Sequence, residues 1–144
     1  TTMANNIKRS GDALALQVTK PAREAGLVLE DLDGDPKRLA NVCVYGFDDL
    51  LLVIDYDRVS ESDRAEIVAS AARDSKSIYQ ARRVSLTESG HGYQVQVPGA
   101  EDAGFHVGDK APVLETQGIL VIYKDGKTRR LADDVITQAG SWEQ

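Results

Sequence analysis

Apolar residues alternate with other residues in two stretches of the chain. The apolar positions are Leu14, Leu16 and Val18 in the first stretch and Tyr93, Val95 and Val97 in the second. Successive side chains of a strand point to opposite faces, so a period of two indicates a strand with one buried face. The pattern therefore predicts a half-buried strand at 13–18 and another at 92–97.

Two pairs of apolar runs follow these stretches, and a short polar turn separates the members of each pair. The runs are "NVCVYG" (41–46) with "DLLLVIDY" (49–56), and "KAPVLET" (110–116) with "ILVIYK" (119–124). Short apolar runs bounded by turn residues are typical of paired strands. We expect turns at Asp48-Asp49 and Gln117-Gly118.

Proline and glycine bracket a short segment after each alternating stretch. Pro21 or Pro98 suits the start of a helical turn, because its φ is preset and its missing N–H is not needed there. Gly26 or Gly104 suits the end, where a left-handed residue is favourable. A single helical turn is therefore predicted in each segment.

The elements recur because the sequence repeats itself. "KPAREAGLVLED" (20–31) aligns with "PGAEDAGFHVGD" (98–109), and the basic stretch "IKRSGD" (7–12) stands opposite "RRVSLTESG" (82–90). The segment 31–40 is extra in the first copy, and we expect it to form a loop. Self-similarity of this kind indicates one structural unit used twice.

Each copy contains two strands, a short helical turn and two further strands. A unit of this size cannot bury enough apolar surface to fold alone, so the two copies must share one core. The predicted fold class is mostly β with short helices. We place the repeats at 4–58 and 78–128.

Two segments outside the repeats have the apolar period of a helix. The apolar stripe is Ile67, Val68, Ala71 and Ala72 in one segment, and Leu131, Val135, Ile136 and Ala139 in the other. Ser60 or Ser62 is a suitable N-cap for the first. We expect a helical linker at 59–77 and a C-terminal helix and tail at 129–144, with Gly140 ending the helix.

Composition indicates a folded globular protein. The chain has 144 residues, 42 % of them hydrophobic and 28 % charged, and a single cysteine, Cys43. One cysteine allows no internal disulfide. No apolar stretch is long enough to cross a bilayer, and no signal peptide is evident. We therefore expect a cytoplasmic protein with no membrane association.

The motifs of common enzymes are missing from the sequence. It has no nucleophile elbow, no phosphate-cradling glycine loop and no patterned carboxylate pair. "DLDGDP" (31–36) alternates carboxylates as a calcium loop does, but Pro36 and Val42 stand where an EF-hand needs Gly and Glu. We expect no enzyme activity, no cofactor and no metal site.

The segments "GYQVQVPGAEDAGFHVGDKAPVLETQGILVIYKDG" (92–126), "LALQVTKPAREAGLVLED" (14–31) and "LLLVIDYD" (50–57) resemble the swapped-hairpin AbrB/SpoVT family. In that family two copies interlock their hairpins into one small barrel. The resemblance implies that this chain carries both copies and forms an intrachain pseudo-dimeric barrel. It also implies DNA binding and transcriptional regulation.

The resemblance assigns the DNA contacts to basic residues on the first strand and around the short helix of each copy. In the first copy these are Lys8 and Arg9 on the strand and Lys20 and Arg23 beside the helix; in the second copy Arg82 and Arg83 match the strand. Two plainer interpretations stay open. In one, Arg82 and Arg83 protect an edge strand from pairing with another chain. In the other, Lys20 and Arg23 form an ordinary charged helix end.

Charge is unevenly distributed between the copies. The net charge is −6, and residues 84–144 hold five basic and nine acidic residues. The second short helix reads Gly99-Ala100-Glu101-Asp102, which places carboxylates where phosphates would approach. A basic surface is therefore expected only on the first repeat and the linker.

Two functions follow as expectations. The first is a DNA-binding transcriptional regulator whose partner is an operator duplex and which forms homo-oligomers. The alternative is a module that has lost most of its DNA affinity and binds a protein partner, as antitoxin-like or scaffold proteins do. The net charge and the acidic second helix motivate the alternative.

Overall fold

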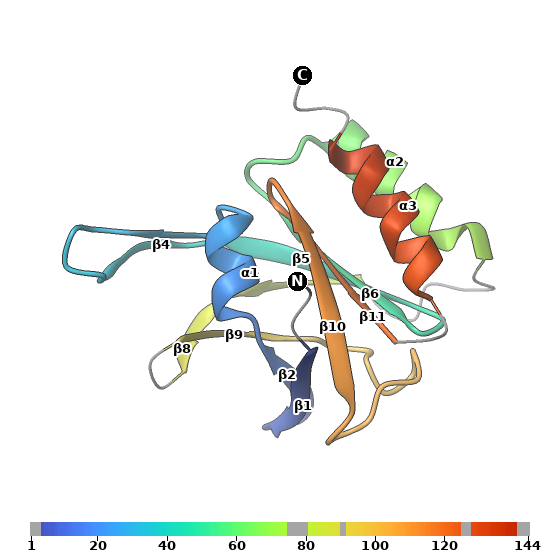
Figure 1. Ribbon diagram of the computed structural model, residues 1–144, viewed down its shortest axis with the longest axis horizontal. Coiled ribbons are helices and arrows are strands. Elements are labelled where there is room, and N and C mark those ends of the chain that lie inside the picture. Colours follow the sequence, from blue (N-terminus) through green and yellow to red (C-terminus); the bar gives the residue numbers. More distant parts are fainter. Residues whose placement is uncertain (1–3, 75–80, 90–91, 125–127, 141–144) are drawn as a thin grey trace.

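The computed structural model describes residues 4–74, 81–89, 92–124 and 128–140, with the backbone alone described at 4–6, 74, 81, 82 and 89. The fold is mostly β with three α-helices in these ranges (Figure 1). The elements are β1 (Ala4–Ser10), β2 (Ala13–Gln17), α1 (Thr19–Glu24), β3 (Val28–Glu30), β4 (Pro36–Leu39), β5 (Asn41–Phe47), β6 (Leu50–Asp55), α2 (Glu61–Ala71), the 3₁₀ turn η1 (Ala72–Asp74), β7 (Ala81–Ser85), β8 (Thr87–Ser89), β9 (Gly92–Gln96), β10 (Lys110–Thr116), β11 (Ile119–Tyr123) and α3 (Arg129–Gly140).

Nine strands form one curled sheet in the order β7-β5-β6-β11-β10-β1-β2-β9-β8, and β3 pairs with β4 alone. Its two edges, β7 and β8, are consecutive along the chain and are separated by Leu86 alone. No ladder joins these two edges in the described part of the chain. The predicted closed barrel is therefore not observed. The sheet curls so far that its two edge strands, β7 and β8, belong to one continuous stretch of chain.

The two halves of the chain are related by an approximate two-fold axis. In the β2–β9 ladder Leu16 lies opposite Val95, and in the β6–β11 ladder Leu52 lies opposite Val121. The sequence repeat aligns these same residues with each other. An antiparallel ladder centred on two equivalent residues places a two-fold axis between them, and here two ladders do so.

Backbone hydrogen bonds cross between the halves in equivalent pairs. The Asp49 N–H donates to the Ala103 carbonyl over 2.8 Å, and its counterpart, the Gly118 N–H, donates to the Ala25 carbonyl over 2.7 Å. Each β-hairpin turn therefore closes against the short segment of the other half. The predicted turns at 48–49 and 117–118 are confirmed, and they hold the halves together.

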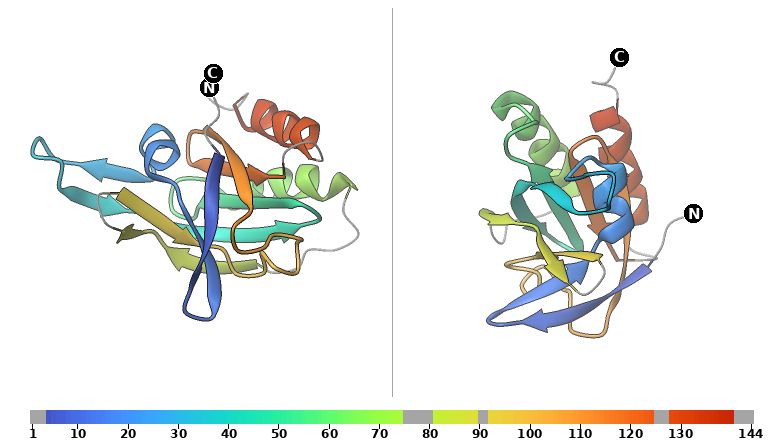
Figure 2. Two further views of the ribbon diagram at one scale, coloured as in Figure 1. Left: turned by 60° about the horizontal axis from the view of Figure 1, so that its bottom comes forward. Right: turned by 90° about the vertical axis from the view of Figure 1, so that its left-hand side faces the viewer.

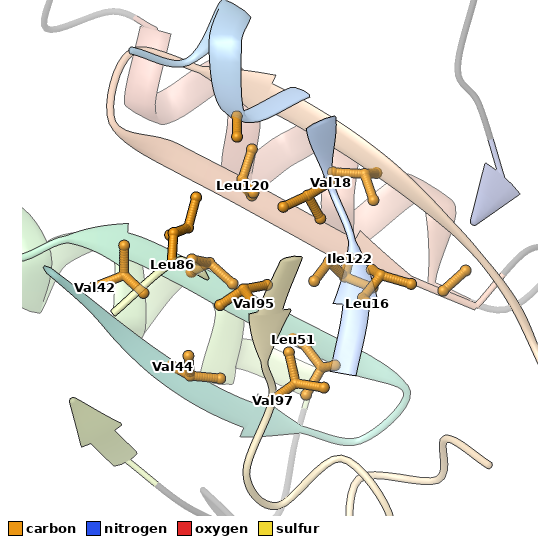
Figure 3. Packing of buried hydrophobic residues seen from close by; sticks show 14 of the residues in the cluster. Leu16, Val18, Val42, Val44, Leu51, Leu86, Val95, Val97, Leu120 and Ile122 are labelled. Carbon is orange, nitrogen blue, oxygen red and sulfur yellow. The ribbon is translucent and has the colours of Figure 1, made fainter. Parts of the chain in front are cut away.

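The first hydrophobic core fills the concave side of the curled sheet. Strands from both halves contribute to it (Figure 3), and its buried side chains include Leu14, Leu16, Val18, Val42, Val44, Leu51, Val53, Tyr93, Val95, Val97, Leu120 and Ile122. The alternating residues predicted from the sequence are all buried here. The shared core that the small size of each repeat requires is confirmed.

A second core lies on the other side of β6 and β11, where α2 and α3 pack side by side (Figure 1). Leu51 and Val53 face the first core, whereas Leu50, Leu52 and Ile54 face the helices. A strand buried on both faces reads as a continuous apolar run, which explains "LLLVI" and "ILVIY".

The two longer helices form where the sequence predicts them. Ser60 is the N-cap of α2, and its hydroxyl accepts the Asp63 N–H over 3.2 Å. Ile67 and Ala71 are buried in α2, and Val135 and Ala139 repeat that spacing in α3. The ends of the predicted segments, 75–77 and 141–144, lie outside the described residues. None of the helices in the described ranges is long and apolar enough to cross a membrane.

The two predicted short helices differ. The first forms as α1, and Gly26 follows it with a φ of 76°. The second, predicted around 98–104, remains a single turn: consecutive turns form there, and the Ala103 N–H donates to the Gly99 carbonyl over 3.0 Å, which closes one helical turn. Gly104 has a φ of 105°, so both segments end at a glycine in the left-handed region, as predicted.

The extra segment of the first half is a β-hairpin rather than the predicted loop. We call residues 28–39 the ribbon: β3 and β4 pair antiparallel and project from the body (Figures 1 and 2). Its base is anchored by Arg38, whose Nη2 bonds both carboxylate oxygens of Asp55 over 3.0 Å. Asp55 is completely buried, so this ion pair fixes the ribbon to the end of β6.

Candidate nucleic-acid interface

The half-sheet β1-β2-β9-β8 has one face toward the first core and one face turned outward. Register decides which side chains point outward, because residues directly opposite each other share a face. The described outward positions are Lys8, Ser10, Ala13, Ala15, Gln17, Thr87, Gln94 and Gln96. We call this set the outer face. Figure 2 shows β1 and β2 on the opposite side of the molecule from α2 and α3.

Lys8 and Arg9, predicted to act together, point to opposite sides of β1. Lys8 lies on the outer face and forms no ion pair with another described residue. Arg9 lies opposite Leu14 on the core side. Its Nη2 bonds Glu101 Oε1 over 3.2 Å, and both side chains are about half exposed. Arg9 therefore bridges the first half to the turn segment of the second half.

Lys20 and Arg23 both lie on α1 with acidic neighbours. Lys20 Nζ is 4.0 Å from Glu24 Oε1, one helical turn away. Arg23 makes a two-pronged ion pair with Glu30, with Nε–Oε1 at 2.8 Å and Nη2–Oε2 at 3.1 Å. Exposed ion pairs of this kind contribute little to the stability of the fold and exchange readily for other anions. Lys20 and Arg23 can therefore bind phosphates by giving up their carboxylate partners.

Tyr93 completes the Arg23–Glu30 group. Its hydroxyl donates to Glu30 Oε2 over 2.7 Å, and the Arg23 guanidinium lies 5.6 Å from its ring centre. The hydrogen bonds from Arg23 and then from Tyr93 lower the pKa of Glu30. The same carboxylate raises the pKa of the Tyr93 hydroxyl, which must lose the proton that it donates. Tyr93 belongs to the second half, so this group also joins the two halves.

Arg82 and Arg83, predicted on the first strand of the second copy, are not the register counterparts of Lys8 and Arg9. They lie on β7, which pairs with β5 at the far edge of the sheet. The register makes Thr87 and Glu88 the counterparts of Lys8 and Arg9, because they lie opposite Gln94 and Tyr93 as Lys8 and Arg9 lie opposite Ala15 and Leu14. The side chain of Arg82 lies outside the described part of the structure.

Arg83 takes part in a different group of side chains. Its guanidinium lies 4.5 Å from the ring centre of Tyr56, and that of Arg64, on α2, lies 4.8 Å from the same ring. We call Tyr56, Arg64 and Arg83 the arginine–tyrosine cluster. Tyr56 and Arg64 could not be predicted as partners of Arg83, since no local pattern links the turn after β6 to α2 and β7.

Carboxylates dominate the second half of the candidate surface. Glu88 stands where the first half has Arg9, and Glu101 stands where it has Arg23. A hollow of about 440 Å³ lies between the β1–β2 hairpin and the turn segment, lined by Asp12, Ala13, Leu14, Val97, Pro98, Gly99, Ala100, Glu101 and Asp102. Its three carboxylates oppose the approach of phosphates, as the sequence predicted for Glu101 and Asp102.

The residues of "DLDGDP" are used to shape the tip of the ribbon. Asp31 Oδ1 accepts the backbone N–H groups of Asp33 and Asp35, each over 2.9 Å. Within the described ranges, no three His, Cys, Asp or Glu side chains come together in a way that suits a metal ion.

Comparison with known proteins adds no relative: no family model, no curated protein and no solved structure matches the chain.

Proposed function

We propose that the protein is a DNA-binding regulator of the AbrB/SpoVT type, built from two swapped-hairpin repeats on one chain. The carrying observation is the two-fold arrangement itself. Leu16 faces Val95 and Leu52 faces Val121, and each hairpin turn bonds the short segment of the other half. Two interlocked hairpin units are the arrangement that the sequence resemblance implies. The proposed repeats keep the bounds 4–58 and 78–128.

The outer face supports a nucleic-acid role. Its described outward positions contain no carboxylate, one cation at Lys8, and amide side chains at Gln17, Gln94 and Gln96. A glutamine amide can donate and accept at a base edge, and strands of a sheet can enter the major groove. A surface of polar side chains without acids is compatible with a phosphate backbone at close range.

In this proposal the first half supplies the cations that contact the DNA phosphates. Lys8 binds phosphate directly, and Arg9, Lys20 and Arg23 exchange their carboxylate partners for phosphates. The second half contributes Gln94 and Gln96, while Glu88, opposite Tyr93, points to the core side of β8. Few phosphates are neutralised in this way, so affinity falls steeply with salt unless chains associate.

The test is fluorescence anisotropy on a duplex that carries the sequence upstream of the chain's own coding region, with a scrambled duplex beside it. We expect tighter binding to the upstream duplex at low salt. Lys8→Gln should weaken binding to both duplexes and reduce the slope of log K against log salt by about 0.9, the value for one phosphate. Gln94→Ala with Gln96→Ala should reduce only the preference between duplexes.

Arg130→Gln is the matched control, because Arg130 is exposed on α3, away from the outer face. It should leave both duplex affinities unchanged. Equal weakening by Lys8→Gln and Arg130→Gln would show that net charge alone sets the affinity. If neither duplex binds at low salt, the proposal is overturned.

A second candidate is a module that binds a protein partner. The carboxylate-lined hollow favours it, since Asp12, Glu101 and Asp102 suit a basic side chain better than a phosphate. Neutralising Lys8, Arg9, Lys20 and Arg23 together separates the two functions. Lost duplex retention supports the regulator. Unchanged retention, with a bound protein that Glu101→Gln and Asp102→Asn release, supports the partner module.

A further inference from the structure

The ribbon breaks the two-fold symmetry of the molecule. In the first half, the ribbon connects Leu27 to Ala40. In the second half, residues 106–108 make the equivalent connection. The ribbon contributes Val28 and Leu39 to the first core at its base, whereas its tip extends away from the body (Figure 1). The shared core therefore needs only the base, and the tip has no packing role within the chain.

The tip presents an apolar side chain on a fixed turn. Leu32 is fully exposed, with a relative exposure of 106 %, and Leu29 on the adjoining strand is 51 % exposed. Asp31 holds the turn through its two carboxylate hydrogen bonds and through its own N–H, which donates to the Asp35 carbonyl over 2.8 Å. A leucine held out in water by a closed turn is suited to insertion into another surface.

The tip is also acidic. Asp33 and Asp35 follow Leu32 by one and three positions, are exposed, and form no ion pair with another described residue. A surface that accepts this tip needs an apolar contact for Leu32 and cations for these two carboxylates.

The arginine–tyrosine cluster supplies both features. Tyr56 is 38 % exposed, which makes it one of the large side chains with apolar surface left open to solvent. The guanidinium groups of Arg64 and Arg83 lie against its ring, and neither forms an ion pair with a described acid. A guanidinium group stacked on a ring can still donate N–H groups of its edge to a carboxylate, although Arg64 also interacts with the Tyr45 hydroxyl.

The cluster and the tip lie at opposite ends of one projection. The Tyr56 N–H bonds the Asn41 carbonyl over 2.9 Å, and Asn41 begins β5 directly beyond the base of the ribbon. Two copies with their ribbons antiparallel therefore bring each tip toward the cluster of the other copy. Such a contact is reciprocal and closes as a two-fold dimer.

We propose that the chain forms a homodimer in which the Leu32 tip of each copy contacts Tyr56 of the other, with Asp33 and Asp35 paired to Arg64 and Arg83. This inference does not depend on DNA binding. If the outer face binds duplex, the dimer also presents two such faces.

The experiment is sedimentation equilibrium on the full chain over a range of concentrations at low salt. The wild type should dimerise, and Leu32→Ser should raise the dimer dissociation constant at least about tenfold, the effect of losing roughly 1.4 kcal/mol. Val107→Ser is the matched control, since Val107 is 55 % exposed in the segment that replaces the ribbon in the second half. It should leave the dissociation constant unchanged. Circular dichroism and the melting temperature establish that each variant is folded.

Charge exchange gives the sharper test. The variant with Asp33→Arg and Asp35→Arg should be monomeric, and so should the variant with Arg64→Glu and Arg83→Glu. Mixed one to one, they should form a heterodimer, because both reciprocal contacts become attractive. A monomeric wild type overturns the inference. So does a wild-type dimer that Leu32→Ser leaves intact, or a mixture that fails to associate.

Discussion

Leu16 lies directly opposite Val95 at the centre of the β2–β9 ladder, and each occupies the same position in its own repeat. Both side chains are buried in the first core, with 1 % and 0 % exposure. Because a two-fold axis passes between them, a cavity at Leu16 opens at the point where the halves meet. Neither half can close such a cavity alone.

Leu16→Ala should therefore lower the free energy of unfolding by about 2–5 kcal/mol. The measurement is urea unfolding followed by circular dichroism. Val107→Ala is the control, since that side chain is 55 % exposed and should change stability by no more than about 0.5 kcal/mol. A cost below about 1 kcal/mol at Leu16 would contradict a core shared across this ladder.

Asp55→Asn should destabilise the fold by about 3–5 kcal/mol, because it leaves the Arg38 guanidinium without its buried partner. The carboxylate also accepts the Asp57 N–H over 3.1 Å, which ties down the chain after β6. Chemical denaturation measures the loss. Asp134→Asn is the control, since its 3.0 Å pair with Arg73 is half exposed and should matter by less than about 1 kcal/mol.

Glu30→Gln should destabilise the protein at neutral pH and make its stability less sensitive to acid. The hydrogen bonds from Arg23 and Tyr93 lower the pKa of Glu30 below its ordinary value of 4.5. A lowered pKa stabilises the fold above pH 4.5, and that stabilisation is lost as the pH falls through the folded-state pKa. Thermal melts from neutral pH to below 4.5 should show the two proteins converging. A constant gap would contradict the assignment.

Glu115→Gln should have the opposite sign at neutral pH. Burial raises the pKa of Glu115 above 4.5, and the neighbouring Glu24 carboxylate of α1 raises it further. A raised pKa means that stability is present below pH 4.5 and is lost as the pH rises through the folded-state value. The variant should therefore melt higher than wild type at neutral pH, and the two should agree in acid. Glu88→Gln, on exposed β8, should melt as wild type does.

Local patterns were sufficient to predict the strands. The alternation at Leu14 and Tyr93, the paired apolar runs and the two polar turns all correspond to observed elements. These features depend on neighbours in the sequence, so a single chain carries enough information. The ribbon could not be predicted from local patterns because its strands are very short. Its base is held by Arg38 and Asp55, which lie 17 positions apart.

The candidate surface was less accessible to sequence reasoning. Arg9 follows Lys8, yet strand alternation sends its side chain to the core side, where it meets Glu101 from 92 positions away. Arg83 precedes Leu86, where one extended stretch divides into β7 and β8, so it lies in a different ladder from Thr87 and Glu88, the counterparts of Lys8 and Arg9. Charge sums cannot reveal such pairing, since ion pairs form between segments that only the fold brings together.

The repeated unit, the two-faced strands and the need for a shared core are encoded in local patterns of the chain, because periodicity and hydrophobic burial act over a few residues. How the halves interlock, that the ladder remains open between β7 and β8, and which cations have carboxylate partners follow from the folded arrangement alone. Those outcomes depend on register between distant strands. A shift of one residue would send every side chain of a strand to the opposite face.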